Sequence, residues 1–268
     1  MYGAILGDII GSPYEFDRGE KTKVFDLFID ESSFTDDTVM TIAVAEALIK
    51  LGKNAKSHEI EKEIIFSMQN WGRKYPNESY GLSFAEWLRE KDPKPYNSFG
   101  NGSAMRVSSV GWLYDSLEKT REVARATAGV THNHPEGIKG AESIASAIYL
   151  ARNGATKAEI KIYVESEFGY DLSRTLEDIR PTYYMYEICQ KTVPEAITCF
   201  LEAEDFEDCI RNAVSIGGDV DTIGAIACSI AEAFFGIPKI LIDECNRRIP
   251  NEMKVVLDNF YNYLNREI

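Results

Sequence analysis

Residues 38–51, which read TVMTIAVAEALIKL, are apolar on almost every side of a helix, so this stretch predicts a buried helix. Residues 138–151 (IKGAESIASAIYLA) repeat apolar side chains at helical spacing. Residues 222–235 (TIGAIACSIAEAFF) are rich in small side chains, which let neighbouring helices approach closely. Further helices are predicted at residues 58–72, 120–128, 157–168, 193–201 and 251–267.

One weak strand candidate, residues 23–29, interrupts this helical pattern. An α/β fold would need regular β-branched runs between the helices, and the sequence lacks them. We therefore expect an all-α fold with many helices, forming a single domain over residues 1–268.

The composition is that of a soluble globular protein, with 44% hydrophobic and 27% charged residues. The 43 acidic and 29 basic residues give a net charge of −14, which argues against a broad nucleic-acid-binding surface. The N-terminus lacks a basic leader before an apolar run, and the apolar stretch near residues 223–237 is too short to span a bilayer. The five cysteines include no Cys-x-x-Cys pair and are typical of reduced thiols. We expect a cytoplasmic protein without membrane contact.

The segment Phe34-Thr35-Asp36-Asp37-Thr38 stands at the start of the first buried helix. Asp and Thr at a helix start accept hydrogen bonds from free backbone amides, so capping is one interpretation. One cap needs only one carboxylate, however, and two adjacent carboxylates repel each other. A divalent cation would relieve this repulsion, so a metal site is the other interpretation.

A second acidic segment, Gly217-Gly218-Asp219-Val220-Asp221-Thr222, precedes the small-residue helix. The paired glycines allow a sharp turn, and Asp-x-Asp-Thr offers an all-oxygen ligand set of the kind that Mg²⁺ and Mn²⁺ prefer. A capped helix after a glycine turn is the simpler interpretation. The two segments together would suffice for a two-metal site if the helix starts converge in space.

The loop at residues 97–106, NSFGNGSAMR, runs into an apolar helix. Backbone amides at such a helix start can bind phosphate without a basic patch, although a surface turn has the same composition. Phe99 in this loop either stacks on a base or fills the core. Residues 131–135, THNHP, contain two of the three histidines. Three interpretations are open for them: contact with a substrate, metal binding, or a polar loop without a further role.

The N-terminal segment at residues 6–15, LGDIIGSPYE, carries a different kind of signal. Gly7 and Gly11 lie four apart, a spacing that suits close helix packing. Asp8 lies in an apolar run and needs partners there. Glu15 follows Pro13, where the helix must end or kink, and is either a general acid or base or a surface carboxylate.

Taken in order, GDIIGSPYE, FTDDT, SFGNGSAMR, THNHP and GGDVDTIG resemble the motifs of the ADP-ribosylglycohydrolase family, from residue 3 to about 236. The family fold is a compact all-α domain. The resemblance implies a hydrolase that removes ADP-ribose from an acceptor by cleaving the C1″ glycosidic bond of the distal ribose. It also implies two Mg²⁺, or Mn²⁺, at the bottom of a cleft.

The resemblance further implies a role for individual residues. The metal ligands would be Thr35, Asp36, Asp37, Asp219, Asp221 and Thr222, and the catalytic residues Glu15, Asp36 and Asp221. The ADP-ribose would contact Ser98, Phe99, Gly100, Asn101, Gly102, Ser103 and His132. His134 has no role in this scheme, and the segment between residues 160 and 214 matches no motif.

Two other functions remain open on the sequence. One is a metal-dependent ADP-ribose-binding module that does not cleave its ligand, and the other is a dinuclear metallophosphatase or nucleotidase. The acceptor would be an ADP-ribosylated protein, nucleic acid or small molecule, and no residue pattern selects among them. We expect the protein to be a monomer.

Overall fold

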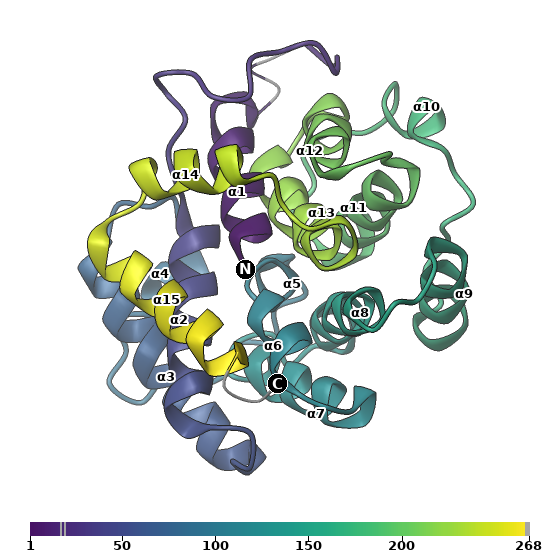
Figure 1. Ribbon diagram of the computed structural model, residues 1–268. Helices are drawn as coiled ribbons and strands as arrows, with labels where there is room; N and C mark the ends of the chain where they lie inside the picture. The colour runs from purple at the N-terminus through teal and green to yellow at the C-terminus, as the bar shows by residue number, and fades with distance from the viewer. Residues whose placement is uncertain (17, 19, 266–268) are drawn as a thin grey trace.

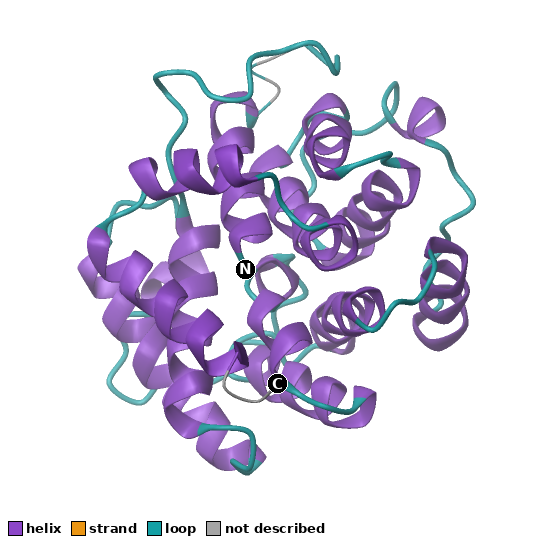
Figure 2. Cartoon of the chain, in the orientation of Figure 1, coloured by secondary structure: helices purple, strands orange, loops and turns teal. Residues whose placement is uncertain are grey.

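The computed structural model describes residues 1–16, 18 and 20–265, and all the regular structure of this part is helical except one bridge between Gly100 and Ile188 (Figure 2). The helices are α1 (Tyr2–Gly11), the 3₁₀ helix η1 (Ser12–Tyr14), α2 (Asp36–Leu51), α3 (Ser57–Lys74), α4 (Leu82–Trp87), α5 (Gly102–Met105), α6 (Ser108–Leu113), α7 (Leu117–Gly129), α8 (Pro135–Arg152), α9 (Lys157–Phe168), α10 (Leu176–Ile179), α11 (Cys189–Glu202), α12 (Phe206–Ser215), α13 (Val220–Phe235), α14 (Lys239–Arg248) and α15 (Asn251–Asn265). The all-α prediction is confirmed. Residues 266 and 267, the end of the predicted last helix, lie outside the described residues.

The predicted strand at residues 23–29 is wrong, because side chains rather than a second strand bind its backbone. Arg211 donates from Nη1 to the carbonyl oxygens of Lys23 and Phe25, both at 2.9 Å. The Tyr14 hydroxyl donates to the carbonyl oxygen of Asp26 at 3.0 Å. These bonds satisfy polar groups that a sheet would otherwise pair.

Helices α1 and α13 lie side by side near the middle of the fold, and both are buried along most of their length (Figure 1). Their backbones touch at two glycines: a Cβ on Gly7 would lie 2.1 Å from the carbonyl carbon of Gly224. One turn further on, a Cβ on Gly11 would lie 2.5 Å from Cα of Asp221. The predicted close packing at Gly7 and Gly11 is confirmed, and it fixes the end of α1 against the start of α13.

The other helices surround this central pair. Helices α2, α3, α4 and α15 lie on one side of it, and α8, α11 and α12 lie on the other (Figure 1). A single cluster of buried apolar side chains runs from Met1 to Phe260 through all these groups. The five cysteines are buried, free thiols. None of the described helices is both long enough and apolar enough to cross a membrane.

Candidate active site

Segments that are far apart in the sequence meet at one cleft with a volume of about 550 Å³. It lies where η1 ends, where α2 and α13 begin, and beside the loop that leads into α5. Its lining residues in the described chain are Glu15, Phe16, Asp36, Asp37, Ser79, Tyr80, Gly81, Leu82, Ser83, Phe84, Tyr96, Ser98, Gly100, Asn101, Gly102, Met105, Arg106, His132, Glu187, Asp219, Asp221 and Thr222. The convergence that the two acidic segments required is therefore present.

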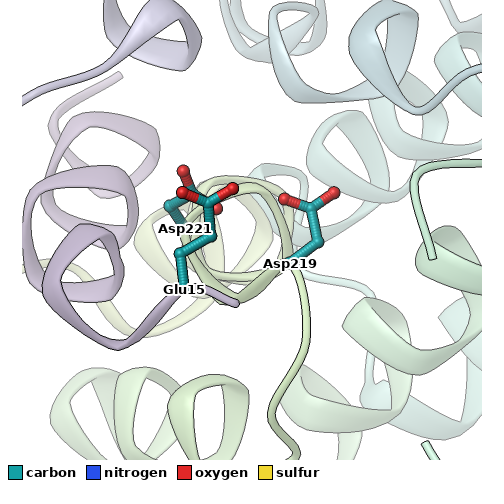
Figure 3. A group of neighbouring side chains, drawn as sticks. All are labelled: Glu15, Asp219 and Asp221. Carbon is teal, nitrogen blue, oxygen red and sulfur yellow. The ribbon is translucent and has the colours of Figure 1, made fainter. Parts of the chain in front are cut away.

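Three carboxylates gather at the floor of the cleft. Glu15, Asp219 and Asp221 each offer an oxygen, and these oxygens all lie within 4.8 Å of one another. Figure 3 shows their carboxylates beside the first turn of α13, with Glu15 reaching over from the segment that follows α1. Glu15 directly follows η1, as expected for a carboxylate placed after a helix-ending proline. Together these carboxylates offer several oxygen ligands to a cation.

The start of α2 adds Asp36 and Asp37 to this centre. Thr222 Oγ1 donates to Asp37 Oδ2 at 3.1 Å, which links the first turns of α2 and α13. The other oxygen, Asp37 Oδ1, is buried and has no hydrogen-bond partner in the described structure. A buried carboxylate oxygen without a donor is costly, so this oxygen is positioned for a ligand that the protein itself does not supply.

Asp8 and Thr35 lie behind this centre. The Asp8 carboxylate accepts from Thr35 N and Oγ1 at 2.9 and 2.8 Å, and from Thr38 N and Oγ1 at 3.0 and 2.5 Å. These bonds satisfy the buried Asp8 and hold the start of α2 against α1. The predicted metal ligand Thr35 is the N-cap of α2, does not line the cleft, and directs its hydroxyl proton to Asp8.

The electrostatics of the site are those of carboxylates crowded in a buried place. Burial, and then the charge of Asp221, raises the pKa of Glu15 to about 8. Burial raises the pKa of Asp219 to about 7. Burial and neighbouring carboxylates also raise the pKa values of Asp36, Asp37 and Asp221 well above their usual range. Such a group resists full ionisation unless a positive charge enters it.

The loop at residues 97–103 borders the acidic centre. Asn101 donates from Nδ2 to Asp219 Oδ2 at 2.5 Å and to Thr192 Oγ1 at 3.0 Å, so its amide already holds a carboxylate. Its backbone N–H donates to the carbonyl oxygen of Glu187. Ser98 lines the cleft, and its Oγ accepts from Gly100 N at 3.1 Å. Gly102 lines the cleft as well.

Two residues predicted to contact the substrate lie outside the cleft. The Ser103 hydroxyl is fully buried and donates to the carbonyl oxygen of Gly137 at 2.7 Å, so it ties α5 to α8. Phe99 is 44% exposed and packs on the ring of His134, with centroids 5.2 Å apart. His134 itself is the N-cap of α8, since its Nδ1 accepts from Glu136 N at 3.1 Å.

Known proteins resemble this chain over most of its length. The sequence profile described as ADP-ribosylglycohydrolase matches residues 1–265, almost the whole chain. The protein belongs to the ADP-ribosylglycohydrolase family. Family membership makes it a hydrolase that acts on ADP-ribosylated acceptors.

Individual ADP-ribosylglycohydrolase relatives cover most of the chain at low identity. ADP-ribosylhydrolase ARH3 of Bos taurus is 27% identical over 90% of this chain and 85% of its own length. ADP-ribosylarginine hydrolase Tri1 of Pseudomonas putida (strain GB-1) is 24% identical over 88% of this chain and 70% of its own length. A solved ADP-ribosylglycohydrolase-related protein complex superposes with a TM-score of 0.72 at 23% identity, covering 98% of this chain and 95% of that one, and thus shares the fold.

The cleft of this ADP-ribosylglycohydrolase also contains residues that the sequence did not single out. Tyr80, Phe84 and Tyr96 give it an aromatic wall, and Glu187 adds a further carboxylate at its edge. The buried cation Arg106 also lines it. Arg106 ends the motif SFGNGSAMR, although the sequence gives it no role, and the aromatic residues carry no signal, because isolated aromatic residues usually fill cores.

Proposed function

We propose that the protein hydrolyses the C1″ glycosidic bond between ADP-ribose and an acceptor, and that it needs a divalent cation to do so. The observation that carries the metal part is Asp37 Oδ1, a buried carboxylate oxygen without a donor, beside the group formed by Glu15, Asp219 and Asp221. The substrate part rests on membership of the family, whose named members act on ADP-ribosylated acceptors.

The donor set fits hard cations such as Mg²⁺ or Mn²⁺, because every candidate ligand is an oxygen. Two ions are proposed, with Asp36, Asp37, Asp219, Asp221 and Thr222 as the ligands. Thr35 joins the proposed set through the resemblance: it does not line the cleft, but a hydroxyl that donates its proton to Asp8 still has lone pairs to offer a cation, as the hydroxyl of Thr222 does. When bound, the ions would supply the positive charge and Lewis acidity that help a water molecule to act as a nucleophile.

The protein's own residues have separate tasks in this proposal. Glycosidic bond cleavage passes through an oxocarbenium-like state, which needs a proton for the leaving acceptor atom or a base for the attacking water. Glu15 is placed for either role: burial raises its pKa to about 8 in the cation-free cleft, which favours the protonated form that can act as the acid, whereas the charge of bound cations would favour the ionised form that can act as the base. The carboxylates of Asp36 and Asp221 would hold the reacting sugar in place through the ions.

The diphosphate is assigned to the side of the cleft formed by the loop at residues 97–103. The backbone at Gly100 and Gly102 has no side chain to block an approaching oxygen, and Ser98 and His132 lie beside it. Because the floor of the cleft is acidic, an anionic ligand would bind at this rim, and its sugar would point toward the carboxylates. Phe99 and Ser103 remain predicted contacts, but neither lines the cleft.

A turnover assay on a panel of substrates tests this proposal. ADP-ribosylated arginine, serine and nucleic-acid substrates would be incubated with the protein and Mg²⁺, and the products identified by mass spectrometry. Release of intact ADP-ribose supports the proposal and identifies the acceptor linkage. AMP or inorganic phosphate as the product would indicate a metallophosphatase or nucleotidase, and ADP-ribose binding without any turnover would indicate a binding module.

The proposed setting is a monomeric, cytoplasmic protein with one domain over residues 1–268. The negative net charge supports a local contact with a modified protein or small molecule rather than a long contact with nucleic acid. Size-exclusion chromatography with light scattering checks the monomer, for which the expected mass is 30.2 kDa.

A further inference from the structure

Arg106 is a fully buried cation without an ion-pair partner among the described residues. It follows α5, its side chain is 1% exposed, and it lines the cleft. Its Nη2 donates to Thr131 Oγ1 at 2.8 Å and, less closely, to the carbonyl oxygen of Thr127 at 3.3 Å. A guanidinium has five N–H donors and no acceptor, and it does not lose its proton in proteins. The direction of the Arg106–Thr131 hydrogen bond is therefore fixed.

The Thr131 hydroxyl has a second contact, at 2.7 Å, with Nδ1 of His132. Thr131 is fully buried, and no further partner of its hydroxyl is found in the described structure. If His132 donated from Nδ1, Oγ1 would accept twice and its own proton would have no acceptor in a buried place, which is costly. The alternative satisfies this hydroxyl fully: Oγ1 accepts from Arg106 and donates to Nδ1.

We infer that Arg106 is a positioning residue, which acts through Thr131 to fix His132 as the neutral tautomer that carries its proton on Nε2. His132 thereby becomes a hydrogen-bond donor into the cleft. The chemistry that such a donor recognises is an anionic or carbonyl oxygen. The identity of that oxygen as part of a diphosphate rests on the proposed function, whereas the tautomer does not.

The position of Nε2 agrees with this inference. A Cβ on Gly102 would lie 3.3 Å from His132 Nε2, and a Cβ on Gly100 would lie 3.5 Å from it, so this nitrogen borders the two glycines of the cleft loop. The hydrogen bonds within the described chain leave Nε2 without an acceptor. Burial, together with the charge of Arg106, also holds the pKa of His132 well below its ordinary value, which keeps the ring neutral.

Nitrogen NMR on protein labelled with ¹⁵N-histidine tests the tautomer directly, because protonated and unprotonated ring nitrogens have well-separated shifts. The chain has three histidines, so assignment needs only single substitutions of His58 and His134. The expected spectrum of His132 at pH 7 has a protonated Nε2 and an unprotonated Nδ1. A protonated Nδ1, or a mixture of the two tautomers, would overturn the inference.

Matched variants test the route through Thr131. Thr131→Ser keeps the hydroxyl and should keep the Nε2–H tautomer, whereas Thr131→Val removes it and should give a mixture. Arg106→Met frees the carbonyl oxygen of Thr127, which shares Nη2 with Thr131, to accept the Oγ1 proton, so Oγ1 can then accept from Nδ1 and a mixture is expected, whereas Arg106→Lys should keep the single tautomer. A single, unchanged tautomer in Thr131→Val would contradict the role of Thr131, even if the Arg106 variants fail to fold.

Ligand binding gives a separate readout. Calorimetric titration with ADP-ribose should show that His132→Gln, whose amide can donate near the position of Nε2, binds roughly ten-fold more tightly than His132→Asn. Equal affinities of the two variants would show that Nε2 does not donate to the ligand. If the wild-type protein failed to bind ADP-ribose at all, the proposed function would fall while the NMR result on the tautomer would still stand.

Discussion

Replacing Asp219 with Asn should make the cation-free protein more stable at pH 7 to 8, although it removes a proposed metal ligand. The amide would keep both contacts of the side chain: its oxygen can accept from Asn101, and its NH₂ group can donate to Asp221. What it removes is a carboxyl whose folded pKa, about 7, lies above its ordinary value of 3.8 because it is buried.

The sign and size of the effect follow from linkage. A carboxyl with a raised folded pKa binds its proton more tightly in the folded state, so its contribution to stability is lost as the pH rises toward that pKa. Between pH 5 and pH 7 the free energy of unfolding therefore falls by about 1.4 kcal/mol per pH unit, or roughly 3 kcal/mol over the two units. For a chain of this size that corresponds to roughly 6–12 °C in melting temperature.

The measurement is urea unfolding in EDTA at pH 5, 6, 7 and 8. Between pH 5 and pH 7, the free energy of unfolding of the wild-type protein should fall by about 3 kcal/mol more than that of Asp219→Asn, by the same linkage. Asp92→Asn, at an exposed position that does not line the cleft, is the control and should follow the wild type. When Mg²⁺ is added at about 100 times its Kd, the free energy of unfolding of the wild-type protein should rise by about 3 kcal/mol, and that of Asp219→Asn should rise much less. Parallel pH curves for wild type and Asp219→Asn would refute the reasoning.

Three further substitutions test other parts of the account. Asp37→Asn should lower Mg²⁺ affinity at least roughly ten-fold by calorimetry, with unchanged circular dichroism, because it weakens a carboxylate placed for a cation; unchanged affinity would count against the metal site. Glu15→Gln should still bind ADP-ribose but turn over roughly 100-fold more slowly, and wild-type turnover would exclude Glu15 as the essential acid or base. Gly7→Ala should destabilise by about 3 kcal/mol or more in urea, because its Cβ would meet the backbone of Gly224 at 2.1 Å. Gly129→Ala, where a Cβ meets nothing within 4 Å, should be near neutral, and equal losses in the two variants would contradict the packing argument.

The sequence predicts most of the long helices and the acidic groups, because both depend on local patterns, but it does not single out α12 or α14. Helical periodicity predicts α2, α8 and α13, and paired Asp residues at the starts of α2 and α13 predict the acidic groups. Their convergence depends on the approach of α1 to α13 at Gly7 and Gly224. The sequence only hints at this contact, through the spacing of small residues.

Side-chain direction is what the sequence does not predict. Thr35 and Ser103 lie in motifs that predict ligand contacts, and the sequence does not show that their hydroxyl protons go to Asp8 and to the carbonyl oxygen of Gly137. These partners are 27 and 34 positions away in sequence. The false strand at residues 23–29 has a similar origin, since the distant Arg211 satisfies its carbonyl groups.

The central claim is that the buried carboxylates form a cation-dependent centre for removing ADP-ribose. Its most direct test is a single reaction with the ADP-ribosylated substrate that the panel selects, run first in EDTA and then after Mg²⁺ is added in excess, with intact ADP-ribose followed by mass spectrometry. The account predicts no release in EDTA and rapid release once Mg²⁺ is present. Release at the same rate in EDTA as in Mg²⁺ would contradict it.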